Sequence, residues 1–215
     1  MALKLHCFGE SGHSYKAALA LQFSGLPWEP VAVDFFNGET RTPEWRTAVN
    51  EMGECPVLHD TDHDYWITQS GAIQDYVSHL SHKNAGNSPE ERREVMRWVL
   101  WDNTKLSSLA GPLRFLLHYV PEDKRPIEVI AWLQARVAGS YGILDTHLQG
   151  RDWIVGDKPT NADFTCCGYL YYPEDFGFDR SAYPAIDSWL SRLAALPGWA
   201  HPYDLMPPAR PENRK

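Results

Sequence analysis

The sequence is poor in cysteine and in long apolar segments. Its 215 residues include four cysteines, and no two of them form a Cys-x-x-Cys pair. No window approaches the roughly 18 uninterrupted apolar residues of a membrane-spanning helix. The N-terminus, MALKLHCFGE, lacks the basic start and the apolar run of a secretory signal peptide. We therefore expect a cytoplasmic protein in a reducing compartment, without a membrane partner.

Positive charge is also scarce. The formal net charge is −8, so the chain lacks the excess of Lys and Arg that general attraction to nucleic acids requires. Aromatic residues are instead abundant, with nine Trp and ten Tyr, and they favour aromatic-lined grooves or interfaces. The hydrophobic content of 43% and the length suffice for one large globular domain or two smaller ones.

The first 81 residues have the pattern of a mixed α/β domain. Apolar alternation indicates strands, and apolar residues spaced by four indicate helices. In chain order we expect a strand at 3–8, a helix at 15–24, a strand at 30–35, a helical turn at 43–49, two strands at 56–59 and 65–67, and a helix at 70–80. A parallel βαβ start followed by an antiparallel hairpin gives a mixed four-stranded sheet with helices on both faces.

Residues 82–87 (HKNAGN) form a polar linker, and residues 88–215 are expected to form an all-helical domain. The linker is followed by SPEE, which combines a Ser cap with Pro at the first helical position and Glu in the first turn. Thr160 and Asp163 form a similar capping pair ahead of an apolar run. The predicted fold class is therefore α/β followed by all-α.

The segment GESGHSYK, residues 9–16, places small polar residues between the first strand and the first helix. The N-terminus of a helix leaves backbone N–H groups unpaired. The turn is therefore either a plain connector or a place that holds an anion.

Two other segments also have features of a ligand-binding backbone. Pro56 opens a strand, where Pro belongs to an edge, a first strand position or a cis bond. A cis bond would leave the backbone of Cys55 free to pair with an extended ligand, and a trans Pro that merely begins a strand fits equally well. Ser70 is predicted to cap the next helix, where a carboxylate is favoured, and Gln69 adds an amide. Simple capping is the alternative.

The order and spacing of these features resemble the glutathione-binding half of the glutathione S-transferase family. The similar stretches are SGHSYKAALAL at 11–21, NEMGECPVLHD at 50–60, ITQSGAIQDYV at 67–77 and, in the helical half, PTNADFTCCGYL at 159–170. The resemblance covers nearly the whole chain, and SGHSYK and LPGWAHPYDLMP suggest a bacterial-type, serine-class-like branch. It implies a thioredoxin-like glutathione-binding domain at 1–81 and a helical domain that contributes the electrophile pocket.

The resemblance also implies a role for each motif residue. Ser11 would be catalytic, donating a hydrogen bond to the glutathione thiolate. Cys55, before Pro56, would pair its backbone with the cysteinyl part of glutathione. Gln69 and Ser70 would hold the γ-glutamyl carboxylate and amine.

Glu54 is expected to contact the ligand, and His13 is expected either to contact the ligand or to cap the turn. Glu54 would stand next to an anionic tripeptide, so we expect either that its side chain points to solvent or that a cation such as Arg41 offsets its charge. Ser14 is the rival of Ser11 for the activating role. We expect Ser14 to lie one residue into the helix with its hydroxyl bonded to the backbone, and we therefore prefer Ser11.

Three functions from different classes are compatible with the sequence. The first is a glutathione transferase, or a related isomerase, dehalogenase or peroxidase. The resemblance implies that it would use glutathione as co-substrate, need no metal, act on a small apolar or aromatic electrophile in detoxification, and form a homodimer. The second is a non-catalytic binding or scaffold protein of the same fold. The third is a glutathione-dependent thiol-disulfide exchanger that uses Cys55.

Three other segments receive structural interpretations. HDTDHD, at 59–64, invites a metal interpretation, but the Gly and Glu that a calcium loop needs are absent, so we expect a solvated hairpin tip. Asp102 and Lys105 are expected to form a helical pair. The Pro-rich, charged end at 207–215 is expected to be loose.

Overall fold

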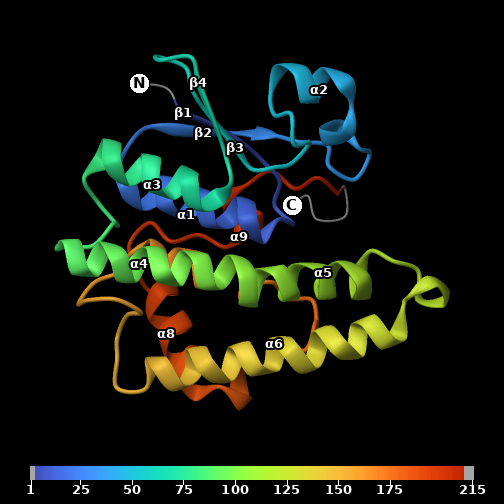
Figure 1. Cartoon of the computed structure of the whole chain (residues 1–215), viewed down its shortest axis with the longest axis vertical. Helices are drawn as coiled ribbons and strands as arrows, with labels where there is room; N and C mark the ends of the chain where they lie inside the picture. Colours follow the sequence, from blue (N-terminus) through green and yellow to red (C-terminus); the bar gives the residue numbers. More distant parts are fainter. Residues whose placement is uncertain (1–2, 211–215) are drawn as a thin grey trace. The chain divides into compact units, whose positions relative to one another are not determined.

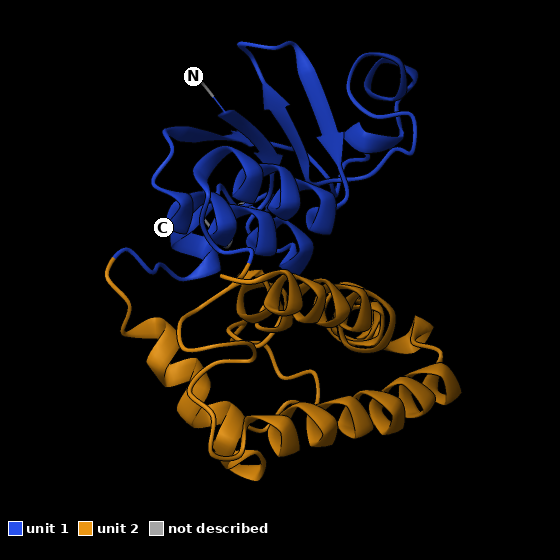
Figure 2. Ribbon diagram, turned by 60° about the vertical axis from the view of Figure 1, so that its left-hand side comes forward, with its two compact units in different colours: residues 1–85, 198–215 blue, residues 86–197 orange. Residues whose placement is uncertain are grey.

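The computed structural model of the chain describes residues 3–210, which form two compact units (Figure 2). Unit 1 contains the residues up to Ala85 together with the C-terminal segment, Gly198–Arg210, and unit 2 contains Gly86–Pro197. Unit 1 is built on a four-stranded sheet and unit 2 is helical. The predicted fold class, α/β followed by all-α, is confirmed.

The sheet of unit 1 has the strand order β2-β1-β3-β4 (Figure 1). Helix α1 (Gly12–Ser24) connects β1 to the parallel strand β2, and β3 runs antiparallel to both β1 and β4. The strands are β1 (Leu3–Cys7), β2 (Trp28–Ala32), β3 (Val57–Asp60) and β4 (Tyr65–Thr68). The predicted position of the second strand, 30–35, is wrong, because the register pairs Leu3 with Trp28 and Cys7 with Ala32.

Side chains of β1 alternate between the two faces of the sheet. Leu3, Leu5 and Cys7 are completely buried and share one face of the sheet. Helices α1 and α3 (Ser70–Ser81) lie along one face of the sheet (Figure 1). His6 points to the opposite face, where its ring lies edge-on to Trp45 of α2 (Pro43–Ala48) at 6.0 Å. Helices therefore lie on both faces, as the sequence predicts.

Unit 2 consists of five α-helices within its described residues. They are α4 (Pro89–Trp101), α5 (Ser107–His118), α6 (Ile127–Leu148), α7 (Asn161–Cys166) and α8 (Pro184–Ala194). A π-helical turn, Asp102–Leu106, joins α4 to α5. The expected pairing of Asp102 with Lys105 is replaced there, because Asp102 is buried and accepts a hydrogen bond from Ser107 Oγ at 2.9 Å. No helix within residues 3–210 is long and apolar enough to cross a membrane.

The start of α7 is a capping box, as Thr160 and Asp163 predict. Asp163 is completely buried, and its carboxylate accepts four hydrogen bonds. Oδ2 receives Thr160 N–H at 2.8 Å and Thr160 Oγ1 at 3.2 Å. Oδ1 receives Ile154 N–H at 2.9 Å and Trp189 Nε1 at 2.9 Å. One carboxylate thus joins α7, the preceding loop and α8.

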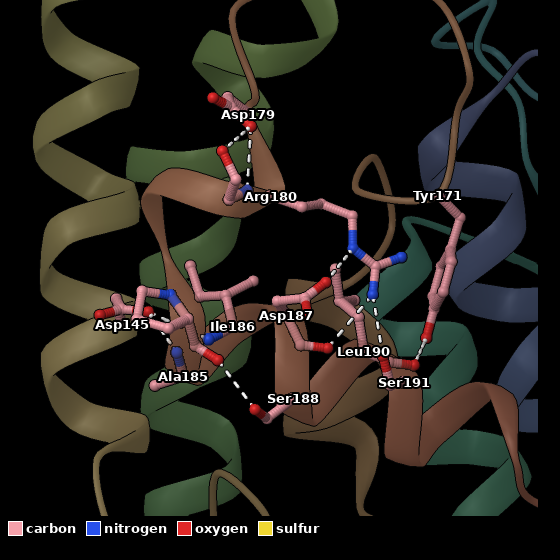
Figure 3. Close-up of polar contacts among 12 residues, drawn as sticks. Asp145, Tyr171, Asp179, Arg180, Ala185, Ile186, Asp187, Ser188, Leu190 and Ser191 are labelled. Atoms are coloured by element: carbon pink, nitrogen blue, oxygen red, sulfur yellow. Dashed lines mark hydrogen bonds and ion pairs between the residues drawn. The ribbon is translucent and has the colours of Figure 1, made fainter.

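The N-terminus of α8 is capped by a residue that is distant in sequence (Figure 3). Asp145 of α6 accepts hydrogen bonds from the backbone N–H groups of Ala185, at 2.9 Å, and Ile186, at 3.0 Å. The carboxylate satisfies donors that a helix start leaves unpaired. Figure 3 also shows the ion pair between Arg180 and Asp187, whose Nε and Oδ1 atoms are 2.6 Å apart.

The C-terminal segment, Gly198–Arg210, packs within unit 1 and not with the helical unit in which the sequence places it. Tyr15 donates its hydroxyl proton to Ala200 O at 2.8 Å, and Gly9 donates its N–H to Pro207 O at 2.8 Å. Helix α9 (Pro202–Leu205) lies in this segment. The expectation of a loose end is wrong for 207–210, because backbone groups in this stretch form hydrogen bonds with Gly9 and with the Glu10 side chain. Residues 211–215 lie outside the described residues.

Candidate functional site

Unit 1 contains a pocket of about 270 Å³. The six residues that the sequence predicts as glutathione-binding line it, and so do two residues that the sequence reasoning missed. The lining residues are His13, Phe35, Gly53, Glu54, Cys55, Pro56, Gln69 and Ser70. The predicted catalytic residue, Ser11, is not part of the lining, although His13 lies two residues further along the same helix start.

The β3–β4 hairpin brings two of the three motif segments together. Its register pairs Val57 with Thr68, so Pro56 and Gln69 lie side by side just beyond the paired residues. The Cys55–Pro56 peptide bond is cis, which decides between the two geometries that the sequence left open. The start of α1 supplies the third segment. Residues far apart in the sequence therefore meet because of the sheet register.

Ser11 occupies the N-cap position of α1. Its Oγ accepts the N–H of Ser14 at 3.1 Å, and its own N–H donates to Phe8 O at 3.1 Å. The residue is 8% exposed. Among residues 3–210, no acceptor takes the hydroxyl proton of Ser11, so that proton is available to a ligand atom.

Ser14 lies deeper in the helix than the sequence reasoning placed it. Because α1 begins at Gly12, Ser14 is its third residue and is completely buried. The partner of its hydroxyl is Cys55 Sγ at 3.8 Å, not the expected backbone carbonyl. Ser14 has no solvent-exposed surface through which a ligand could contact it, whereas Ser11 retains a small one.

The Cys55 side chain is half-buried, and its thiol is protonated. It donates to His6 O at 3.1 Å. Burial raises the pKa of the thiol to about 12, although the hydrogen bond with Ser14 acts in the opposite direction. A thiol with this pKa is not ionised at neutral pH, and it is the thiolate that attacks disulfides and electrophiles.

His13 is a neutral imidazole at neutral pH. Burial lowers its pKa to about 3, and the nearby positive charge of Lys16 acts in the same direction. Its Nδ1 lies 3.4 Å from Lys16 Nζ. Because an ammonium group can only donate, Nδ1 is the acceptor and Nε2 carries the ring proton. His13 is thus an uncharged side chain that bears its ring proton on Nε2.

Glu54 and Gln69 interact with each other at the edge of the pocket. Gln69 Nε2 donates to Glu54 Oε2 at 2.8 Å. The expected partner of Glu54, Arg41, does not line the pocket. The carboxylate is exposed, so water screens its repulsion of an anionic ligand.

The prediction that Ser70 caps α3 is wrong. The helix begins at Ser70 itself, and Gln69 stands at the cap position with φ 68° and makes no side-chain cap hydrogen bond. No side chain at the cap position therefore satisfies the first N–H groups of α3. Unsatisfied N–H groups at a helix start favour a bound carboxylate.

Phe35 and Gly53 were not predicted as part of the site. Phe35 stacks on Phe8 with ring centroids 4.6 Å apart, whereas its apolar alternation with its neighbours predicts a strand position. Gly53 has φ 70°, and a Cβ there would lie 2.6 Å from Arg46 Nη2. The only sequence signal for Gly53 was its place beside the x-Pro motif.

The hairpin tip is solvated, as the sequence predicts, with Asp62, His63 and Asp64 exposed, but Asp60 at the end of β3 is not. Asp60 is completely buried and accepts hydrogen bonds from Tyr76 Oη at 2.6 Å, His63 Nδ1 at 2.9 Å and Asp62 N at 3.1 Å. Within residues 3–210, no group of three or more His, Cys, Asp or Glu residues is arranged to hold a metal ion. Asp60 therefore fastens the hairpin to α3.

Comparisons with known proteins identify the family of the chain. The model of the glutathione S-transferase N-terminal domain matches residues 1–79, and that of the C-terminal domain matches residues 114–197. The chain belongs to the glutathione S-transferase family. A solved structure of a possible glutathione S-transferase from Rhodopseudomonas palustris is 28% identical, with a TM-score of 0.85 over 93% of this chain and 89% of that one.

The sequence relatives carry two kinds of name. Glutathione S-transferase GST-4.5 from Xanthomonas campestris is 29% identical over 82% of this chain and 86% of its own length. Elongation factor 1-gamma from Rattus norvegicus is also 29% identical, over 86% of this chain but only 42% of its own length. The chain thus spans less than half of that relative. Ure2p, solved in complex with glutathione, is 20% identical with a TM-score of 0.81, which shows a common fold.

Proposed function

We propose that the chain is a glutathione transferase that activates the glutathione thiol at the N-terminus of α1. The observation that supports this most strongly is the gathering of His13, Cys55 and Gln69, from three separate segments, around one pocket. Ser11 stands two residues before His13, at the cap of α1, with a hydroxyl proton to donate. The family that the chain belongs to acts on glutathione, which agrees with the proposed function.

Each end of glutathione has a matching group in the proposed complex. The backbone of Cys55 pairs with the cysteinyl part as a neighbouring strand would. Gln69 and the free N–H groups at the start of α3 hold the γ-glutamyl end, where a helix N-terminus favours a carboxylate. His13 donates its Nε2 proton as a neutral partner.

The chemistry then requires only a lowered thiol pKa. A free thiol has a pKa of about 8.5 and is mostly protonated at neutral pH. The positive end of α1 and the hydroxyl of Ser11 both stabilise the thiolate more than the thiol, so they lower that pKa. The thiolate sulfur forms a bond to an electrophilic carbon of the substrate, and the leaving group departs with the electron pair of the broken bond. We further infer that the substrate is a small apolar or aromatic electrophile and that the protein forms a homodimer.

Turnover with an activated aryl chloride tests this function. We expect wild-type protein to conjugate glutathione to the aryl carbon, and Ser11→Ala to lose at least tenfold in kcat/KM because the thiolate loses a hydrogen bond. Ser188→Ala, which removes an exposed hydroxyl bonded to Pro184 O in α8, is the matched control. Equal turnover in the Ser11 variant and the wild type would exclude Ser11 as the activating residue.

A non-catalytic scaffold is the second candidate, and the elongation factor 1-gamma relatives favour it. This function predicts that the protein binds glutathione, or nothing, and conjugates no electrophile. The third candidate, a disulfide exchanger using Cys55, is disfavoured because the pKa of that thiol is raised to about 12. It predicts that Cys55→Ser abolishes disulfide reduction while Ser11→Ala does not.

A further inference from the structure

The turn that leads into α1 is held by the far end of the chain. The turn runs from Phe8 to Ser11 and is closed by the hydrogen bond from Ser11 N to Phe8 O, 3.1 Å. Both of its middle residues bind the C-terminal segment. Gly9 donates its N–H to Pro207 O at 2.8 Å, and Glu10 accepts from two further backbone groups. The backbone just before Ser11 is therefore fixed from outside the turn.

Glu10 makes the stronger of these two connections. Its Oε2 accepts the N–H of Ala209 at 2.9 Å and its Oε1 accepts the N–H of Arg210 at 3.0 Å. The residue is only 3% exposed. Hydrogen bonds to an ionised carboxylate are roughly twice as strong as neutral ones, and a buried carboxylate that loses its donors is costly. Separation of the C-terminal segment from the turn is thus strongly disfavoured.

Close packing adds a steric constraint at the same place. A Cβ at Gly9 would lie 3.1 Å from Tyr203 Cδ1 and 3.4 Å from Pro208 Cα. The C-terminal segment therefore sits directly on the backbone of the turn, and a larger side chain at this position would push the two apart.

The same segment also supports one wall of the pocket. The guanidinium of Arg210 lies 4.8 Å from the centroid of the Phe36 ring. Phe36 in turn packs edge-on against Phe35, with centroids 5.6 Å apart, and Phe35 lines the pocket. Arg210 therefore acts on the pocket indirectly, because it packs on Phe36, which packs on Phe35. Glu10 acts on the site through the turn that precedes Ser11.

We propose that Glu10 is a positioning residue that uses the C-terminal segment to fix the Ser11 hydroxyl against the glutathione sulfur. The inference rests on the proposed function, because the position of Ser11 matters to a thiol only if glutathione binds. Stabilisation of a thiolate depends on the direction and distance of one hydroxyl. A functional group must be held within about 0.5 Å of its productive position to be fully effective. A turn with two externally anchored residues meets that requirement better than a free turn.

The first test variant is Glu10→Gln, which keeps the shape of the side chain but places an NH2 group against one of the two backbone donors. We expect hydrogen exchange of the Ala209 and Arg210 amides to accelerate about tenfold, with smaller accelerations at Gly9 and Ser11. We also expect the thiol pKa of bound glutathione to rise toward its free value. Gln22→Ala is the matched control, because Gln22 also binds the C-terminal segment, through Gly198 O at 2.9 Å, but lies far along α1 from the turn.

A second variant, Ala209→Pro, removes one of the two donors and leaves Glu10 intact. If Glu10 acts through the C-terminal segment, this variant also raises the thiol pKa, and the Glu10→Gln change has a smaller effect in its background than in wild type. Additive effects of the two changes on the thiol pKa would overturn the proposal.

The two proposals fail in distinguishable ways. Accelerated exchange at Ala209 and Arg210, with unchanged exchange at Gly9 and Ser11, would show that Glu10 merely anchors the chain end and would overturn the positioning role. If wild-type protein does not lower the thiol pKa of glutathione, the proposed function fails. The exchange rates of Gly9 and Ser11 then decide alone whether Glu10 orders the turn.

Discussion

Replacement of Asp163 by Asn is expected to destabilise the helical unit strongly. The carboxylate is completely buried and receives four hydrogen bonds, from Thr160 N, Thr160 Oγ1, Ile154 N and Trp189 Nε1. Asn keeps the shape of the side chain and one acceptor oxygen. In the least costly orientation that oxygen retains the bonds from Ile154 and Trp189, and the new NH2 group faces the N–H of Thr160.

The magnitude follows from the donors that lose their partner. A buried donor left without an acceptor costs about 1–3 kcal/mol, and the two retained bonds weaken because their acceptor is no longer charged. We therefore expect Asp163→Asn to lower the free energy of unfolding by about 2–4 kcal/mol. Asp163→Ala leaves the donors of Thr160, Ile154 and Trp189 unpaired, and we expect it to cost still more.

Urea unfolding at neutral pH measures this difference. The control is Asp187→Asn, which makes the same chemical change in the half-exposed ion pair with Arg180 (Figure 3). Exposed ion pairs contribute at most about 1 kcal/mol. A loss below about 0.5 kcal/mol for Asp163→Asn, or equal losses for the two variants, would refute the central role of the buried carboxylate.

Three further predictions concern unit 1. His13 has a folded-state pKa of about 3, so below about pH 6.5 the unfolded chain binds a proton that the folded chain does not. Wild-type unfolding free energy should fall by up to about 1.4 kcal/mol per pH unit between pH 6 and 4, and urea titrations should show a shallower slope for His13→Asn. Tyr76→Phe removes the 2.6 Å hydrogen bond to Asp60 and should lower stability by about 1–2 kcal/mol; an unchanged urea midpoint would contradict this. Cys55→Ser should leave the calorimetric affinity for glutathione within a few fold, since in the proposed complex the backbone of Cys55, not its thiol, binds the ligand. A loss above tenfold would mean that the thiol itself contacts glutathione.

Local sequence rules were sufficient for much of the fold. The spacing of Thr160 and Asp163 and the sequence SPEE identify helix starts, because a cap and its partner lie within one turn of each other. The order of strands and helices followed from apolar periodicity. The second strand was misplaced because Phe35 alternates with its neighbours for a different reason, namely its packing against Phe8 beside the pocket.

Contacts between distant parts of the sequence could not be predicted in the same way. The side chain of Glu10 meets backbone N–H groups about 200 residues later, and backbone groups carry no residue-specific signal. Ser70 is the first residue of α3, and Gln69, with a φ of 68°, is its cap. The sequence pattern does not reveal this backbone conformation. The gathering of the predicted binding residues was expected only from the resemblance, and the hairpin register supplies its physical cause.

Titration of bound glutathione by ultraviolet absorbance tests the central claim most directly. Thiolate absorbance is followed against pH in wild-type protein, in Ser11→Ala and in the control Ser188→Ala. We predict a thiol pKa at least about one unit below the free value of about 8.5 in wild type and in the control, with a rise toward the free value in Ser11→Ala. Glutathione that binds with an unshifted pKa, or a lowered pKa that survives the loss of Ser11, would contradict activation of the thiol by Ser11.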